Sequence, residues 1–108
     1  MLDRLLLSDK RQIILSEEQA IIRIHGEGSY CTVYSQLHHP ITISRNLAAM
    51  ERRLQSPNFL RVHQSHLVNL GKIRQIDQRD GCTLLMVDDS KVPVSRRQKA
   101  SLLKRLRN

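Results

Sequence analysis

The apolar residues of this chain fall in short runs that predict β-strands along most of its length. The runs last roughly two to six residues and are separated by polar or glycine-containing turns, a spacing too brief for helices. Turns such as a four-residue hairpin loop at residues 26–29 predict antiparallel pairing of neighbouring strands. The predicted strands occupy residues 5–7, 12–15, 20–25, 30–35, 41–44, 82–87 and 91–94, with further short strands between residues 59 and 76.

Two segments instead carry the apolar spacing of amphipathic helices. In the first, over residues 46–54, apolar residues recur at i, i+3 and i+7, and Ser44 or Asn46 is available as the N-cap. The second covers about residues 96–106 and has Ser95 as its N-cap candidate. These patterns together predict a mainly β protein with a short mid-chain helix and a C-terminal helix.

Length and charge narrow the class of protein and of partner. The 108 residues suit a single domain over residues 1–108, because one core of this size needs no metal or disulfide staple. The 18 Lys and Arg residues against 10 Asp and Glu residues give a formal net charge of +8, which indicates a polyanionic partner. The basic residues crowd the C-terminal end, at Arg96, Arg97, Lys99, Lys104, Arg105 and Arg107. Charge alone leaves DNA, RNA, an anionic membrane surface or a merely solvated helix face open.

Several function classes lack their sequence signals. Cys31 and Cys82 lie in separate strand-like runs, so we expect free thiols in a reducing cytoplasm. No apolar run approaches the roughly 20 residues of a membrane span. The His63 and His66 pair lacks a cysteine or carboxylate cluster that would complete a metal site, and we expect neither metal nor cofactor. No nucleophile–base pair or phosphate-cradling glycine loop is visible, so we expect no enzyme.

Three ordered motifs carry a family resemblance. They are IIRIHGEGSYCTVY at residues 21–34, NFLRVHQSHLVNLGKI at residues 58–73 and VPVSRRQK at residues 92–99. In this order they resemble the LytTR family of bacterial transcriptional regulators, over roughly residues 10–107. The resemblance implies small stacked antiparallel β-sheets with two helices. It also implies duplex-DNA binding through loops in successive major grooves.

The resemblance assigns base contacts to three loop or strand-end positions rather than to one recognition helix. They match the edge formed by Tyr30, Cys31 and Thr32, of which we take Cys31 as the contact, and then Gln64 and Arg97. A glutamine amide can pair with adenine N6 and N7, and an arginine with guanine O6 and N7. The family most often has arginine at the second position and its best-studied members have histidine near the first. Because this chain departs at both, the operator preference is not carried over.

The remaining polar residues of the motifs divide into phosphate contacts and structural support. The imidazole of His63 could contact DNA, or it could pack inward and hold its turn through a backbone hydrogen bond. We expect the second role. Asn69 is expected to be a turn residue, because asparagine tolerates the left-handed conformation just before Gly71. Phosphate contacts are predicted at Arg61, Ser65, Lys72, Arg96 and Lys99.

We therefore expect sequence-specific binding of double-stranded DNA, at direct-repeat sites as family members commonly do. Such domains are usually the output half of a response regulator in a two-component system, driven by a phosphorylatable receiver domain. This chain lacks a receiver and is expected to be either an excised C-terminal domain or a stand-alone regulator, monomeric or weakly dimeric. The alternative is a small basic β module that binds an acidic protein partner or RNA.

Overall fold

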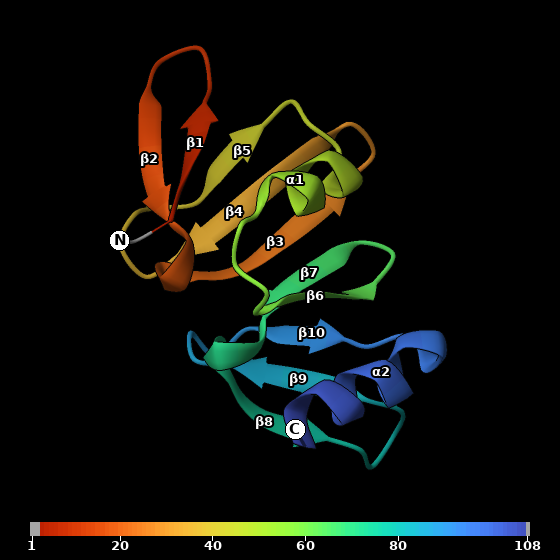
Figure 1. Cartoon of the computed structure of the whole chain (residues 1–108). Coiled ribbons are helices and arrows are strands. Elements are labelled where there is room, and N and C mark those ends of the chain that lie inside the picture. The colour runs from red at the N-terminus through yellow and green to blue at the C-terminus, as the bar shows by residue number, and fades with distance from the viewer. Residues whose placement is uncertain (1–2, 108) are drawn as a thin grey trace.

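The computed structural model describes residues 3–107 and confirms a mainly β fold with two α-helices (Figure 1). Ten strands form three antiparallel sheets within these residues. Pairing follows the order β1-β2, β5-β4-β3-β7-β6 and β10-β9-β8. The elements are β1 (Arg4–Ser8), β2 (Ile13–Glu17), the 3-10 turn η1 (Glu18–Ala20), β3 (Ile21–Glu27), β4 (Tyr30–Ser35), β5 (Ile41–Ile43), α1 (Leu47–Arg53), β6 (Phe59–His63), β7 (His66–Asn69), η2 (Leu70–Lys72), β8 (Ile73–Asp77), β9 (Thr83–Met86), β10 (Lys91–Pro93) and α2 (Arg96–Arg107).

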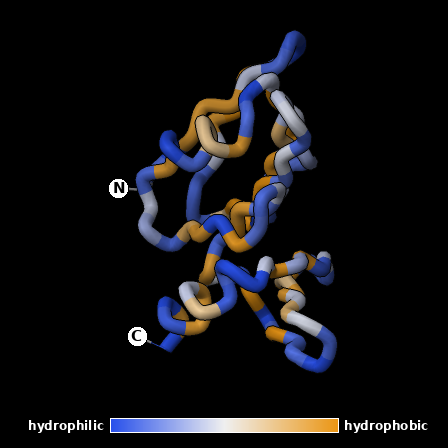
Figure 2. Tube along the Cα trace, turned by 90° about the vertical axis from the view of Figure 1, so that its right-hand side faces the viewer, coloured by the Kyte–Doolittle hydropathy of each residue, from blue (hydrophilic) through white to orange (hydrophobic). Residues whose placement is uncertain are grey.

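The sheets stack along the long axis of a molecule that measures 42 × 32 × 24 Å. The β1–β2 hairpin lies at one end, the five-stranded sheet in the middle and the three-stranded sheet with α2 at the other end (Figure 1). The turns at both ends are hydrophilic, whereas the apolar segments lie along the strands between them (Figure 2). Each pair of neighbouring layers can therefore bury its own core.

The central sheet contributes side chains to two separate cores. Successive residues of a strand point to opposite faces, so Leu67 joins the core shared with α1 and the β1–β2 hairpin, while Val68 joins the other. In β3, Ile24 belongs to the first core and Ile22 to the second, and the register shifts between Ile21 and Arg23. Leu102, which is 0% exposed, anchors α2 in the second core. The sheet is thus held on both sides, and its turns are the parts left free.

Short-range sequence signals predicted most ends of the helices and strands, with one difference at the turn between β3 and β4. Asn46 rather than Ser44 caps α1, since its side chain accepts a hydrogen bond from Ala49 N at 2.8 Å. Ser95 Oγ accepts from Gln98 N at 3.3 Å at the start of α2. The expected four-residue loop at residues 26–29 is wrong, because Glu27 pairs with Tyr30 and leaves a two-residue turn. Gly28 occupies that turn at φ +57°, a conformation that favours glycine.

Candidate nucleic-acid interface

Three chain segments far apart in sequence meet along one edge of the molecule. They are the β3–β4 turn, the β6–β7 turn and the start of α2, which all lie on the right in Figure 1. Gly26 N donates to Ser65 O at 2.9 Å, and Ser95 N donates to Val62 O at 2.8 Å. These two backbone hydrogen bonds tie the β6–β7 hairpin to both neighbours. The edge is therefore a fixed array, here called the three-turn edge.

The middle segment of this edge presents Gln64 on a braced turn. Strand pairing ends at His63 and His66, so Gln64 and Ser65 form a two-residue turn. His63 Nδ1 accepts from Ser65 N at 3.0 Å, and Arg61 Nη2 donates to Gln64 O at 2.6 Å. The Gln64 side chain is exposed. His63 and Arg61 therefore both brace this turn, and the bracing by Arg61 was not foreseen from the sequence.

A cluster of imidazoles lies immediately behind the turn. The rings of His25 and His66 stack with centroids 4.8 Å apart, and the His63 ring lies 5.2 Å from that of His66. His66 Nδ1 is buried and has no hydrogen-bond partner among residues 3–107. The pKa of His66 is lowered to about 4, mainly by burial and to a smaller extent by the neighbouring His25 and His63. His66 is therefore neutral near pH 7 and packs as an aromatic support.

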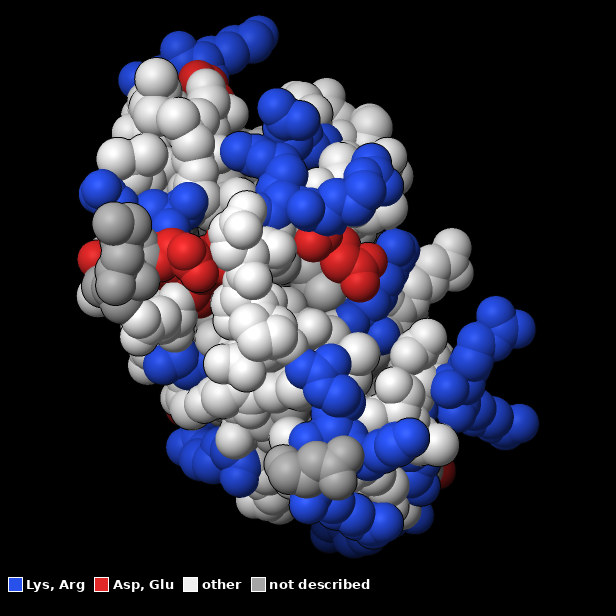
Figure 3. Space-filling model, viewed as in Figure 1, with Lys and Arg blue, Asp and Glu red and all other residues white. Residues whose placement is uncertain are grey.

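The start of α2 brings cationic groups to the same edge. Arg96 and Arg97 are exposed in the first turn, and Lys99 is half-buried. The first backbone N–H groups of a helix also lack intrahelical partners and favour anions. Lys and Arg side chains gather over α2 and around α1 in the space-filling view, with few acidic side chains among them (Figure 3). This end of the array suits contact with phosphates and with guanine.

Cys31 does not reach the surface. Its side chain is 1% exposed and packs in the first core, where burial raises the pKa of its thiol. A base contact by Cys31 would require the core to open, so Cys31 is removed from the proposed contacts. Tyr30, the residue that sequence reasoning passed over, is 55% exposed at the same turn. The alternation along β4 was the available signal, since Cys31 and Val33 share the apolar face.

Lys72 and Asn69 lie at the other end of the β6–β7 hairpin. Given the rise of β-strands, Lys72 is on the order of 15–20 Å from Gln64, and the structure does not bring it to the three-turn edge. Asn69 is 4% exposed, accepts from Gly71 N at 3.0 Å and donates to Ile21 O at 2.8 Å. Asn69 thus holds the turn through these bonds, but its φ of −84° is extended, so the expected left-handed conformation is wrong.

Comparison with known proteins decides the family. The LytTR family, described as LytTr DNA-binding domain, matches residues 10–107. This chain belongs to the LytTR family. The sensory transduction protein LytT of Bacillus subtilis is 34% identical over 105 residues, which cover 95% of this chain and 43% of that protein. The heme-containing CO-sensing transcriptional regulator RcoM 2 of Paraburkholderia xenovorans is 35% identical over 96 residues, 86% of this chain and 36% of that protein.

A solved structure supports the same fold. A LytTr DNA-binding domain from Bacillus cereus superposes with a TM-score of 0.77 at 24% identity, covering 96% of this chain and 95% of that one. The chain is thus a DNA-binding domain of the kind found in transcriptional regulators, and the acidic-partner or RNA alternative is not favoured. LytTR is a DNA-binding rather than an enzymatic family.

The chain spans about two-fifths of the length of these curated relatives. No helix among residues 3–107 is long and apolar enough to cross a membrane.

Proposed function

We propose that the three-turn edge reads duplex DNA, with Tyr30, Gln64 and Arg97 touching bases. The observation that carries the proposal is the pair of backbone hydrogen bonds that lock the β6–β7 turn to its neighbours. A turn whose backbone is fixed before binding loses little backbone entropy when its side chains meet a base edge. Gln64 stands at the middle of the edge and suits adenine, and Arg97 suits guanine at one end. Tyr30 replaces Cys31 at the other end, since its ring and hydroxyl are accessible.

The phosphate contacts of the proposal are the cationic and polar groups that flank these three. Arg96 and Lys99 stand on α2, and Ser65 and the remaining N–H groups of Arg61 stand beside Gln64. Lys72 is left out because of its distance from the edge. If the three cations of this set, Arg61, Arg96 and Lys99, each neutralise one phosphate, log K should fall with log salt at a slope of about −3.

The domain would act within a longer cytoplasmic regulator. This rests on the relatives, which are named as a sensory transduction protein and a transcriptional regulator and are more than twice as long as the matched region. A receiver domain that is phosphorylated, and binding to direct repeats, follow from the family resemblance. The isolated domain is expected to be a monomer or a weak dimer, since a separate domain would supply the dimer contact.

The test is selection of this domain on a randomised duplex library, followed by binding of variants to the selected site. Arg97→Ala should lower affinity for that site by about 1–3 kcal/mol, roughly 5- to 150-fold, and lower affinity for random duplex much less. Gln64→Ala should also lower affinity for the selected site more than affinity for random duplex, through another base position. Lys72→Ala is the matched control and should leave both affinities nearly unchanged. A pool that stays random, or equal losses on selected and random duplex, would contradict base reading.

A further inference from the structure

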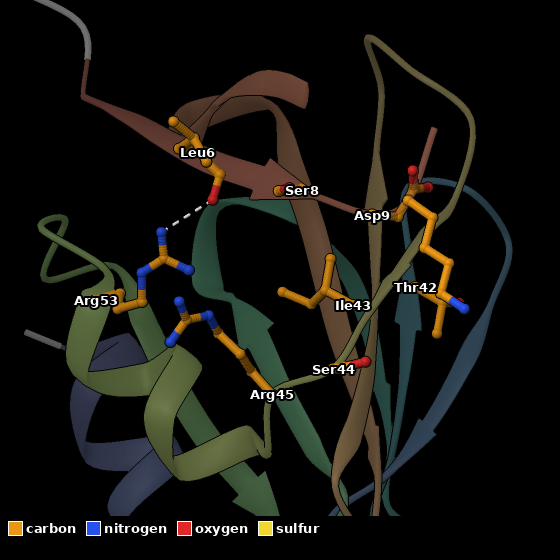
Figure 4. Close-up of a pocket in the computed structure, with 9 residues that line it drawn as sticks. Leu6, Ser8, Asp9, Thr42, Ile43, Ser44, Arg45 and Arg53 are labelled. Atoms are coloured by element: carbon orange, nitrogen blue, oxygen red, sulfur yellow. Dashed lines mark hydrogen bonds between the residues drawn. The ribbon is translucent and has the colours of Figure 1, made fainter. Parts of the chain in front are cut away.

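A second cationic hollow lies beyond the three-turn edge. It has a volume of about 440 Å³ and opens between the β1–β2 hairpin, β5 and the segment that leads into α1. Its polar lining residues come from all of these elements (Figure 4). They are Ser8, Asp9, Lys10, Thr42, Ser44, Arg45 and, from α1 itself, Arg53.

Two guanidinium groups share one end of this hollow. Arg53 Nη2 donates to Leu6 O at 2.9 Å, which holds its side chain across the gap between α1 and β1. Figure 4 shows the Arg45 guanidinium extending toward that of Arg53. Like charges placed side by side repel, and an anion between them removes the repulsion and satisfies N–H groups that have no partner among residues 3–107.

No carboxylate within residues 3–107 pairs with either arginine. The ion pairs described there join Arg74 to Asp89 and Arg79 to Asp77, both in the three-stranded sheet region. Asp9, the acidic residue of the lining, accepts from the backbone N of Arg11 and of Gln12 within its own turn, which lowers its pKa. It lies across the hollow from the two guanidinium groups (Figure 4). The cationic end is thus open to an external anion.

We propose that Arg45 and Arg53 form a phosphate-binding site that takes a backbone phosphate of the duplex flanking the base-reading site. Two planar guanidinium groups suit a phosphate, which offers several oxygens as acceptors, better than a halide, which is a single spherical ion. The location favours DNA as the source. Asn46, next to Arg45, lines a neighbouring hollow together with Gly28, Gln64 and Ser65 of the three-turn edge. A free phosphate group has the same chemistry and is the other source to be distinguished.

The inference rests on the proposed function, and the test separates the two. Fluorescence anisotropy would compare the selected duplex, trimmed to its core, with the same duplex lengthened by about one helical turn at each end. Arg45→Gln should weaken binding to the long duplex several-fold and make its salt slope shallower by about one. It should leave the core duplex unaffected. Arg52→Gln removes the same charge from an exposed position on α1 outside the hollow and should change neither affinity.

A second arm uses inorganic phosphate and needs no DNA. In ¹⁵N NMR titrations, phosphate should shift resonances of Leu6, Arg45 and Arg53 in the wild type but not in Arg45→Gln. A loss confined to the long duplex supports the flanking-phosphate site. Phosphate shifts without any dependence on duplex length reassign the site to a free phosphate. If Arg45→Gln and Arg52→Gln change the affinity for the long duplex equally, and phosphate shifts no resonances, the proposed phosphate site is overturned. If the wild-type domain fails to bind the core duplex more tightly than random duplex, the result would instead count against the proposed function alone.

Discussion

Lowering the pH from 7 toward 4 should destabilise this domain through His66. The ring stacks on His25, lies beside His63, and keeps a buried Nδ1 without a hydrogen-bond partner in residues 3–107. A proton on this ring would place a charge among two other imidazoles and Arg23. The folded state therefore resists protonation that the unfolded chain accepts.

The sign and size follow from the two pKa values. His66 has a pKa of about 4 in the folded protein, against an ordinary value of 6.5. Between these values the unfolded state binds more protons, so the free energy of unfolding falls as the pH drops from about 6.5 toward 4 and is unaffected by His66 above that window. At 1.36 kcal/mol per unit the full gap amounts to about 3 kcal/mol. Since His66 is half-buried rather than fully buried, solvent screening reduces this to on the order of 1–2 kcal/mol.

Urea unfolding at pH 7, 6, 5 and 4.5, followed by circular dichroism, measures this term. His66→Phe keeps a flat ring against His25 but removes the titrating group, so its stability should fall less with pH than that of the wild type. His39→Gln changes an exposed histidine and should follow the wild type. Carboxylates also titrate in this range, and the difference between variants cancels their contribution. Parallel curves for the wild type and His66→Phe would refute the reasoning.

Three further predictions concern the supports of the fold, each measured by equilibrium unfolding. Glu18 is 1% exposed and its carboxylate accepts two backbone N–H groups from the segment after α1, so Glu18→Ala should cost about 2–3 kcal/mol; a loss under about 0.5 kcal/mol would contradict this. An added Cβ at Gly26 would lie 2.9 Å from Leu47 Cβ, so Gly26→Ala should cost about 1–3 kcal/mol. Leu102→Ala should cost about 2–5 kcal/mol, and Leu106→Ala, at a position 39% exposed, under about 1 kcal/mol; equal losses would place α2 differently.

Local patterns were sufficient to predict the helices and strands and the hydrogen bonds within some of the turns. The period of two in the apolar runs, the helical spacing after Asn46 and the cap at Ser95 depend on neighbours within a few residues, and all appear in the structure. The bracing role of His63 was also local, because its partner Ser65 is two residues away. Motifs in order along the chain added the family, since no single one of them would have been specific.

Burial and proximity were decided by tertiary structure, because they depend on elements distant in sequence. Alternation along β4 defines two faces, but only the packing of α1 and the β1–β2 hairpin makes the Cys31 face the core and leaves Tyr30 outside. Lys72 shares a motif with Gln64 yet lies at the far end of the hairpin, since a strand carries the chain away from its turn. The sequence by itself therefore determined the strands, helices, charge and family. Only the folded chain determined which polar side chains share one edge, because the hydrogen bonds Gly26–Ser65 and Val62–Ser95 join segments 39 and 33 residues apart.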